Sequence, residues 1–281
     1  MQPRSAYHQI AGSEVHVLTW GADSAPPVIL WHGLARTGRD FDDLAAALAD
    51  RYRLICPDTP GRGLSQWSAA PDSDYCMAAY ARLAAGLADR LGLGRFAWVG
   101  TSMGGALGIA AAAGSLRGRI SHLALNDIGP TLPSAAGARI RAYLGHPPDF
   151  ATLSEFDAYL RTIYRPFGAH TDAQWRRMAE TSFRRLPNGR VTAHYDPAIV
   201  RQFDLYPRDF EQWDAYESLA LPTLVLRGAE SDLLTPEVAA EMGRRGPGAA
   251  CVTIPGCGHA PALNVAEQIA ILRGFLAGPG G

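Results

Sequence analysis

The stretch "WVGTSMGGALG", residues 98–108, joins two different local patterns around one serine. Apolar residues typical of a buried strand run up to Gly100, and small and apolar residues typical of a helix follow Ser102. The pentapeptide from Gly100 to Gly104 has the form G-x-S-x-G, which between a strand and a helix places the serine on a sharp turn. We therefore predict that Ser102 is exposed at a sheet edge, beside helix amides that favour negative charge.

Strand and helix patterns alternate on both sides of this turn. Short apolar runs predict strands within 14–20, 27–33, 52–58, 95–100, 120–130, 221–228 and 250–256, and most of the intervening segments have helical character. This alternation is typical of an α/β fold, in which helices cover both faces of a mostly parallel sheet.

The alternation stops between residues 131 and 212. Amphipathic patterns over 153–167 and 171–186 predict helices there, and aromatic residues are frequent throughout the segment. Ligands of open α/β folds bind at the carboxyl edge of the sheet. We therefore expect a core formed by residues 1–130 and 213–281, and a helical lid formed by residues 131–212 that covers this edge.

The composition excludes several classes of function. The net charge is −1, which gives no field that would favour nucleic acid or an anionic membrane as a partner, and no uninterrupted apolar run is long enough to span a membrane. The sequence contains no lysine, which excludes Schiff-base chemistry and a P-loop. The four cysteines and eight histidines show no metal-ligand spacing, so we expect neither a metal nor a cofactor. With no apolar secretion signal near residue 1, a cytoplasmic location is expected.

A serine hydroxyl needs a base to remove its proton, and the base needs a carboxylate to orient it. His259 follows the last predicted strand, so its loop lies at the same sheet edge as Ser102. Asp232, in the loop after the preceding strand, is the acid that we predict for His259. Glu230 in the same loop and Asp127 at the end of an earlier strand are the alternatives.

Acyl transfer also requires two donors for the oxyanion. The backbone N–H of Met103, directly after the nucleophile, is one candidate. The N–H of Leu34, in the loop after the strand that ends at His32 and Gly33, is the other. We interpret His32 as a brace for this loop.

Taken together, these motifs resemble the α/β-hydrolase superfamily. The chain order Ser102, Asp232, His259, with "HGL" and "PDTPGRGLS" upstream, is similar to its lid-bearing branch of esterases, lactonases, meta-cleavage-product hydrolases and perhydrolases. The resemblance implies a serine hydrolase, because relatives that are epoxide hydrolases or haloalkane dehalogenases carry aspartate at the nucleophile position.

The substrate expected is a small molecule, a carboxylic ester of small to medium size with apolar character. Tyr159 and Trp175 in the lid and Arg36 after the oxyanion loop are candidate binding residues. The same triad would also serve the hydrolysis of lactones or hydroxyalkanoate oligomers, the cleavage of a carbon–carbon bond in a dienoate or diketone, or perhydrolysis. A ligand receptor that kept the fold without turnover is the non-enzymatic alternative. The sequence leaves the oligomeric state open.

Overall fold

A computed structural model of the protein describes residues 2–278. Its centre is an eight-stranded sheet with the order β1-β2-β4-β3-β5-β6-β10-β11, in which β1 and β4 pair antiparallel with β2 and all other neighbours are parallel. The α/β-hydrolase fold expected from the sequence is confirmed. The strands are β1 (Arg4–Ile10), β2 (Ser13–Trp20), β3 (Pro27–Trp31), β4 (Arg53–Pro57), β5 (Phe96–Thr101), β6 (Ile120–Asn126), β10 (Thr223–Gly228) and β11 (Ala250–Ile254).

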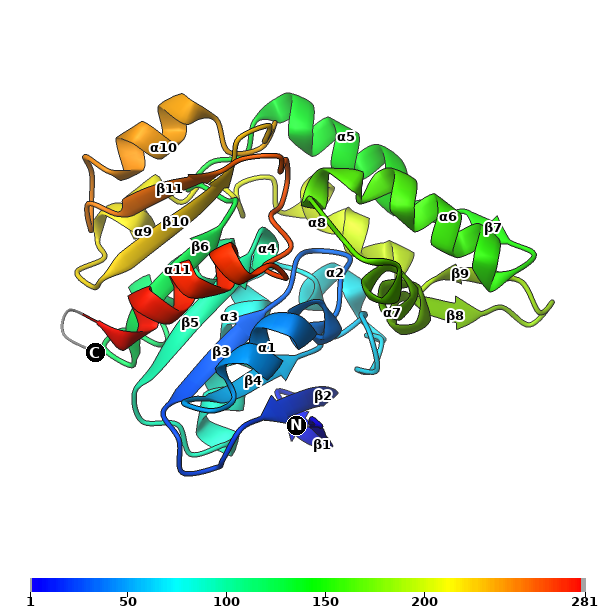
Figure 1. Ribbon diagram of the computed structural model, residues 1–281. Coiled ribbons are helices and arrows are strands. Elements are labelled where there is room, and N and C mark those ends of the chain that lie inside the picture. The colour runs from blue at the N-terminus through cyan, green and yellow to red at the C-terminus, as the bar shows by residue number, and fades with distance from the viewer. Residues whose placement is uncertain (1, 279–281) are drawn as a thin grey trace.

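Helices cover both faces of this sheet, as the alternating pattern predicted. Figure 1 shows α1 (Asp42–Leu48) and α11 (Ala266–Ala277) in front of the strands, and α3 (Met77–Arg90) and α4 (Met103–Ala113) behind them. Four shorter elements complete this part of the chain: η1 (Gly38–Phe41), α2 (Pro71–Asp74), α9 (Trp213–Glu217) and α10 (Pro236–Met242).

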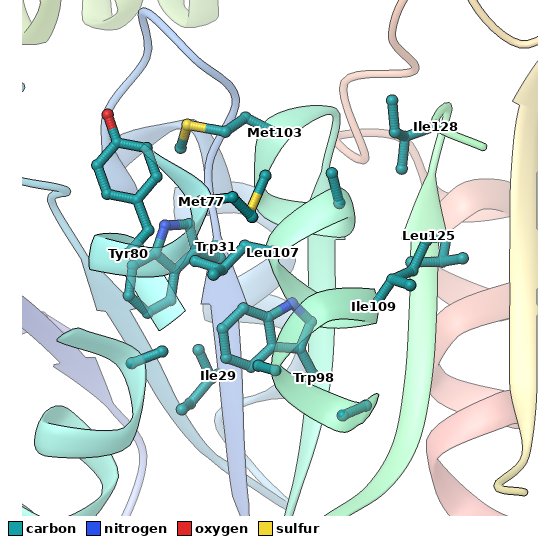
Figure 2. Close-up of a cluster of buried hydrophobic side chains, with 14 of the residues drawn as sticks. Ile29, Trp31, Met77, Tyr80, Trp98, Met103, Leu107, Ile109, Leu125 and Ile128 are labelled. Carbon is teal, nitrogen blue, oxygen red and sulfur yellow. The ribbon is translucent and has the colours of Figure 1, made fainter. Parts of the chain in front are cut away.

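The central strands send successive side chains to opposite faces. In β3, Ile29 and Trp31 join the core cluster packed under α3 and α4, whereas Val28 and Leu30 join the cluster under α1 and α11. Figure 2 shows the first cluster, where the rings of Trp31 and Trp98 stack with centroids 5.1 Å apart. The indole of Trp98 also donates to the carbonyl of Gly104, which fixes the start of α4 against β5.

Before α9, the segment between β6 and β10 contains four helices and a small sheet. The helices α5 (Ser134–Leu144), α6 (Leu153–Ile163), α7 (Asp172–Ser182) and α8 (Gln202–Leu205) are joined by the turns η2 (Arg165–Phe167) and η3 (Pro197–Arg201). The strands β7 (Asp149–Phe150), β8 (Phe183–Arg185) and β9 (Val191–Ala193) pair antiparallel in the order β7-β9-β8. This sheet was not predicted, because strands of two or three residues are too short to show alternation. The helix expected over 171–186 accordingly ends at Ser182.

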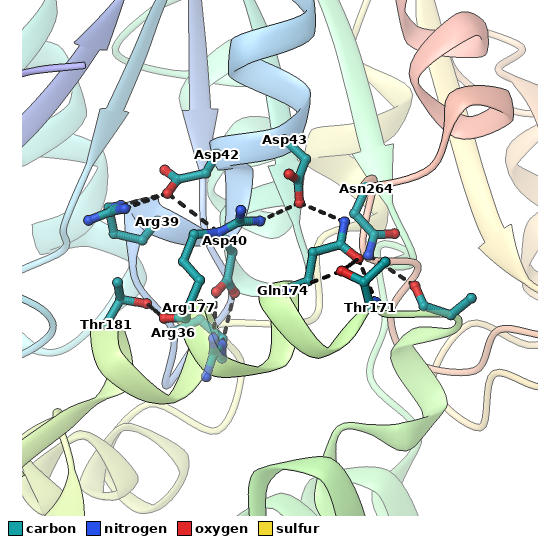
Figure 3. A network of polar contacts seen from close by, with 11 residues as sticks. Arg36, Arg39, Asp40, Asp42, Asp43, Thr171, Gln174, Arg177, Thr181 and Asn264 are labelled. Carbon is teal, nitrogen blue, oxygen red and sulfur yellow. Dashed lines mark hydrogen bonds and ion pairs between the residues drawn. The ribbon is translucent and has the colours of Figure 1, made fainter. Parts of the chain in front are cut away.

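Polar contacts attach α7 to the start of α1. The amide of Gln174 donates to Asp43 over 3.0 Å, and Arg177 pairs with the same carboxylate (Figure 3). Nearby, the side chain of Asn264 donates to the carbonyl of Ala169. These contacts hold this part of the segment beside the carboxyl edge of the central sheet.

Candidate active site

Ser102 lies between β5 and α4 in a backbone conformation that L-residues rarely adopt, with φ 53° and ψ −119°. The turn is closed so tightly that side chains are excluded beside it. A Cβ atom on Gly100 would lie 2.2 Å from the carbonyl oxygen of Gly104, and one on Gly104 would lie 2.1 Å from that of Trp31. The glycines of the pentapeptide therefore allow the sharp turn that presents the Ser102 hydroxyl.

The structure brings Ser102 and His259 together, as the sequence predicted. His259 lies in the loop between β11 and α11, and its Nε2 atom is 2.9 Å from Ser102 Oγ. The other ring nitrogen, Nδ1, is 2.8 Å from Oδ2 of Asp127. A histidine that donates from Nδ1 to a carboxylate presents an unprotonated Nε2, so this ring can accept the serine proton.

Asp127 is the carboxylate beside His259, and it directly follows β6. Its side chain is completely buried and accepts two further hydrogen bonds, from the backbone N–H of Gly228 at 2.7 Å and from the hydroxyl of Ser231 at 2.6 Å. These donors come from the end of β10 and the loop that follows it. The carboxylate therefore connects the histidine to two neighbouring strands of the sheet.

Asp232, which the sequence analysis placed beside His259, lies elsewhere. Its carboxylate forms an ion pair of 2.7 Å with Arg139 of α5, and its side chain is 55% exposed. The reason is the turn at Ser231, whose hydroxyl donates inward to Asp127 and accepts from the amides of Leu233 and Leu234. Ser231 thus occupies the inward position and its neighbour Asp232 lies at the surface. The alternative Glu230 is exposed as well.

Leu34 and Met103 are the residues whose amides the sequence predicted as oxyanion donors. Both residues line the same cavity as Ser102 and His259, and Met103 is the first residue of α4. Within residues 2–278, neither backbone N–H donates a hydrogen bond to another group. Two unused donors next to a serine hydroxyl can bind a developing oxyanion.

His32 braces the loop that carries Leu34. Its Nδ1 atom is 2.7 Å from the carbonyl oxygen of Gly33, and its Nε2 atom accepts from the backbone N–H of Thr59 at 2.9 Å. The ring is fully buried, and this burial lowers the pKa of His32 to about 4. A neutral imidazole that donates on one side and accepts on the other fixes the loop in one conformation.

Ser102 opens into a cavity of about 300 Å³. The segment between β6 and β10 supplies most of its apolar wall. Apolar and aromatic residues of that segment that line the cavity are Ile128, Leu132, Ile140, Tyr143, Tyr159, Ile163, Tyr164, Phe167, Phe203 and Phe210.

The three predicted binding residues have different positions. Tyr159 lines the cavity, and so does Arg36. The guanidinium of Arg36 is already engaged, because it forms two hydrogen bonds with Asp40, of 2.8 and 2.5 Å (Figure 3). It also lies 4.6 Å from the ring centre of Tyr164. Trp175 does not line the cavity. It stacks on the ring of His170 with centroids 4.3 Å apart, on the α7 side of the segment.

Arg139 also lines the cavity and was missed in the sequence. One signal was available: the residues four positions before and after it, Ala135 and Tyr143, are not acidic, so Arg139 has no partner at that spacing on its own helix. This signal does not show which face of α5 meets the core, so the place of Arg139 in the cavity wall became evident only in the structure.

A second serine–histidine–aspartate array lies where the N-terminal hairpin of β1 and β2 meets the loop after β4. Ser5 Oγ is 2.8 Å from Nε2 of His16, whose Nδ1 is 2.8 Å from Oδ2 of Asp58. Asp58 also accepts from the amides of Gly38 and Leu64. Burial alone would raise the pKa of Asp58, but the hydrogen bond with His16 and the other favourable contacts outweigh it and lower this pKa below its ordinary value.

No helix within residues 2–278 combines the length and the apolar character needed to cross a membrane.

The chain is similar along nearly its whole length to proteins that have already been described. A 3-hydroxybutyrate-oligomer hydrolase of Cupriavidus necator is 39% identical, over 98% of this chain and 93% of the relative. A 2-(acetamidomethylene)succinate hydrolase of Mesorhizobium japonicum is 27% identical, over 84% of this chain and 82% of the relative.

Solved structures agree with this similarity. The crystal structure of an alpha/beta hydrolase from Novosphingobium aromaticivorans superposes with a TM-score of 0.87 at 34% identity, covering 98% of each chain. The model of the alpha/beta hydrolase family matches residues 28–271, from the start of β3 into α11. The serine on its sharp turn, the eight-stranded sheet and these matches lead to one conclusion: the chain belongs to the alpha/beta hydrolase family.

Proposed function

We propose that this protein hydrolyses carboxylic esters, with short oligomers of a hydroxyalkanoate as its substrates, and that Ser102, His259 and Asp127 form its catalytic triad. The observation that carries the proposal is the continuous hydrogen-bond chain Ser102–His259–Asp127 at a cavity with apolar walls. The choice among esters is supported by the 39% identical relative named for hydrolysis of 3-hydroxybutyrate oligomers.

The first half of the reaction forms an acyl-enzyme. His259 Nε2 accepts the proton of Ser102 while Oγ adds to the ester carbonyl carbon, and the amides of Leu34 and Met103 donate to the resulting oxyanion. The bond between this carbon and the alkoxy oxygen then breaks. The departing alkoxide takes the proton from His259, and the negative charge of Asp127 stabilises the imidazolium in between.

The second half releases the acid. A water molecule takes the place of the alcohol, His259 removes its proton, and the hydroxide oxygen adds to the acyl carbon. When the bond to Ser102 Oγ breaks, the proton returns from His259 to the serine. Each step uses only groups of the chain and water.

The experiment is a substrate panel with purified protein. We expect hydrolysis of p-nitrophenyl acetate, butyrate and hexanoate and of 3-hydroxybutyrate dimer and trimer, with the butyrate ester and the oligomers preferred over the acetate because of the apolar cavity. A lactone and a vinylogous diketone in the same panel represent the other chemistries that this triad could perform. Turnover of the diketone alone, or of no compound in the panel, would contradict the proposal.

A further inference from the structure

Two guanidinium groups line the cavity, and they differ in how fully their charges are paired. Arg36 is 6% exposed and makes two hydrogen bonds to Asp40, so its charge is neutralised within the loop. Arg139 makes one ion pair, from Nη2 to Oδ2 of Asp232, and half of its side chain is exposed. A guanidinium has five N–H donors, which leaves Arg139 with the capacity to bind a second anion.

The position of Arg139 relates this capacity to Ser102. Arg139 belongs to α5, between the cavity-lining residues Leu132 and Tyr143, and its partner Asp232 precedes Leu233, which lines the cavity from the core side. The ion pair therefore lies where α5 meets the loop after β10. Because Arg139 and Ser102 line the same cavity, the guanidinium can bind an anionic group of a substrate held there.

We propose that Arg139 binds the terminal carboxylate of the oligomer and thereby directs cleavage toward its carboxyl end. This inference rests on the proposed function. A hydroxyalkanoate oligomer carries one charge, the carboxylate of its last unit, and this unit belongs to the alcohol that leaves when Ser102 attacks an ester bond. Arg139 thus selects the leaving group, whereas the acyl part of the chain occupies the remaining apolar cavity.

Asp232 competes with the substrate for Arg139. Its carboxylate holds the guanidinium of Arg139 when no substrate is present, and the substrate carboxylate competes with it for the same donors. Because both side chains are half exposed, the ion pair between them is weak enough to be replaced.

The test compares the free acid of 3-hydroxybutyrate trimer with its methyl ester, in which the charge is removed. We expect the wild-type protein to show a kcat/KM about 10-fold higher for the acid, the typical worth of a charge-assisted hydrogen bond. R139Q should lose this preference for the acid. R139K keeps the positive charge without the planar guanidinium and should retain part of the preference. The acetylated trimer should release free 3-hydroxybutyrate first.

Arg141 provides the matched control. It lies two residues further along α5, has a similar exposure and also pairs with an exposed aspartate, Asp204, but does not line the cavity. R141Q should discriminate between acid and methyl ester as the wild type does. Equal losses in R139Q and R141Q would show that only the net charge of the segment matters, and would overturn the proposal.

Two further outcomes are decisive. D232N removes the competing carboxylate, so the preference for the acid over the methyl ester should rise about two- to threefold, in line with the small energies of exposed ion pairs. A fall of this preference to the level of R139Q would show that the ion pair serves to hold α5 in place. That result would overturn the proposal. Wild-type protein that cleaves acid and methyl ester equally well would refute this inference alone. Protein that cleaves neither would refute the proposed function itself.

Discussion

The molecule contains two serine–histidine–aspartate arrays whose hydrogen bonds have nearly the same length. At the hairpin, the serine–histidine and histidine–aspartate distances are both 2.8 Å, and at the cavity they are 2.9 and 2.8 Å. Their surroundings differ. Ser5 lies on the exposed outermost strand, whereas Ser102 lies at a strained turn beside unused amides and a cavity. Under the proposed function, only the array at the cavity has the substrate space and the free amides that an acyl-transfer site needs.

The sharpest contrast between the arrays is the effect of removing each serine. Ser102→Ala should lower kcat by about 10⁵-fold or more, because only binding and the oxyanion donors remain. Ser5→Ala should stay within about twofold of the wild type. Initial rates with p-nitrophenyl butyrate measure both variants. A comparable loss in Ser5→Ala would mean that the hairpin array takes part in catalysis.

The carboxylates give the next largest contrast. Asp127→Asn should lower kcat by about 10⁴-fold, because an amide beside Nδ1 favours the wrong histidine tautomer. Asp232→Asn should retain a kcat within about threefold of the wild type for p-nitrophenyl butyrate, because its carboxylate contacts Arg139 and not His259. An inactive Asp232→Asn together with an active Asp127→Asn would show that Asp232 is the acid of the triad, as the sequence predicted.

The two histidines should have similar effects on stability and different effects on activity. His16→Ala leaves the buried carboxylate of Asp58 without its partner, so the free energy of unfolding should fall by about 3 kcal/mol while kcat/KM at 25 °C stays within about twofold. His259→Ala should remove activity and should also lower the free energy of unfolding by about 3 kcal/mol, because it leaves the buried carboxylate of Asp127 without its partner. Urea unfolding followed by fluorescence, with assays on the same samples, distinguishes the two patterns.

His32 holds the Leu34 loop against Thr59, and its protonation should appear as a pH dependence of stability. Its pKa is about 4 in the folded protein and 6.5 as the ordinary value, so between these pH values the unfolded chain binds the extra proton. Stability from this residue is therefore complete above pH 6.5 and is lost as the pH falls toward 4. The loss between pH 7.5 and pH 5 should be about 2 kcal/mol.

Urea unfolding at both pH values measures this loss, and His32→Gln supplies the control. The variant has no titratable group at this position, so its stability should change less between pH 7.5 and pH 5 than that of the wild type. The same pH dependence in both proteins would assign the effect to other groups.

Much of the fold could be predicted because it depends on local patterns. The strand and helix periodicities and the glycines around Ser102 indicated the sheet, the sharp turn and the pairing with His259. The acid could not be chosen in the same way. Asp127 and Asp232 both follow strands that end at one edge, and the choice between them depends on the turn at Ser231. The cavity wall depends on how each helix is rotated, which the sequence pattern does not show. The rotation of α5 brings Arg139 to the cavity, and α7 places Trp175 against His170 and not in the wall.

The backbone at Ser102 has a consequence for how such a protein evolves. A positive φ costs a residue with a Cβ atom about 1 kcal/mol or more, and glycine avoids this cost. Ser102→Gly should therefore unfold at a higher urea concentration than Ser102→Ala, although both lack the nucleophile. A lineage selected for thermal robustness alone would drift toward glycine at this position. The serine would persist only where turnover itself is under selection.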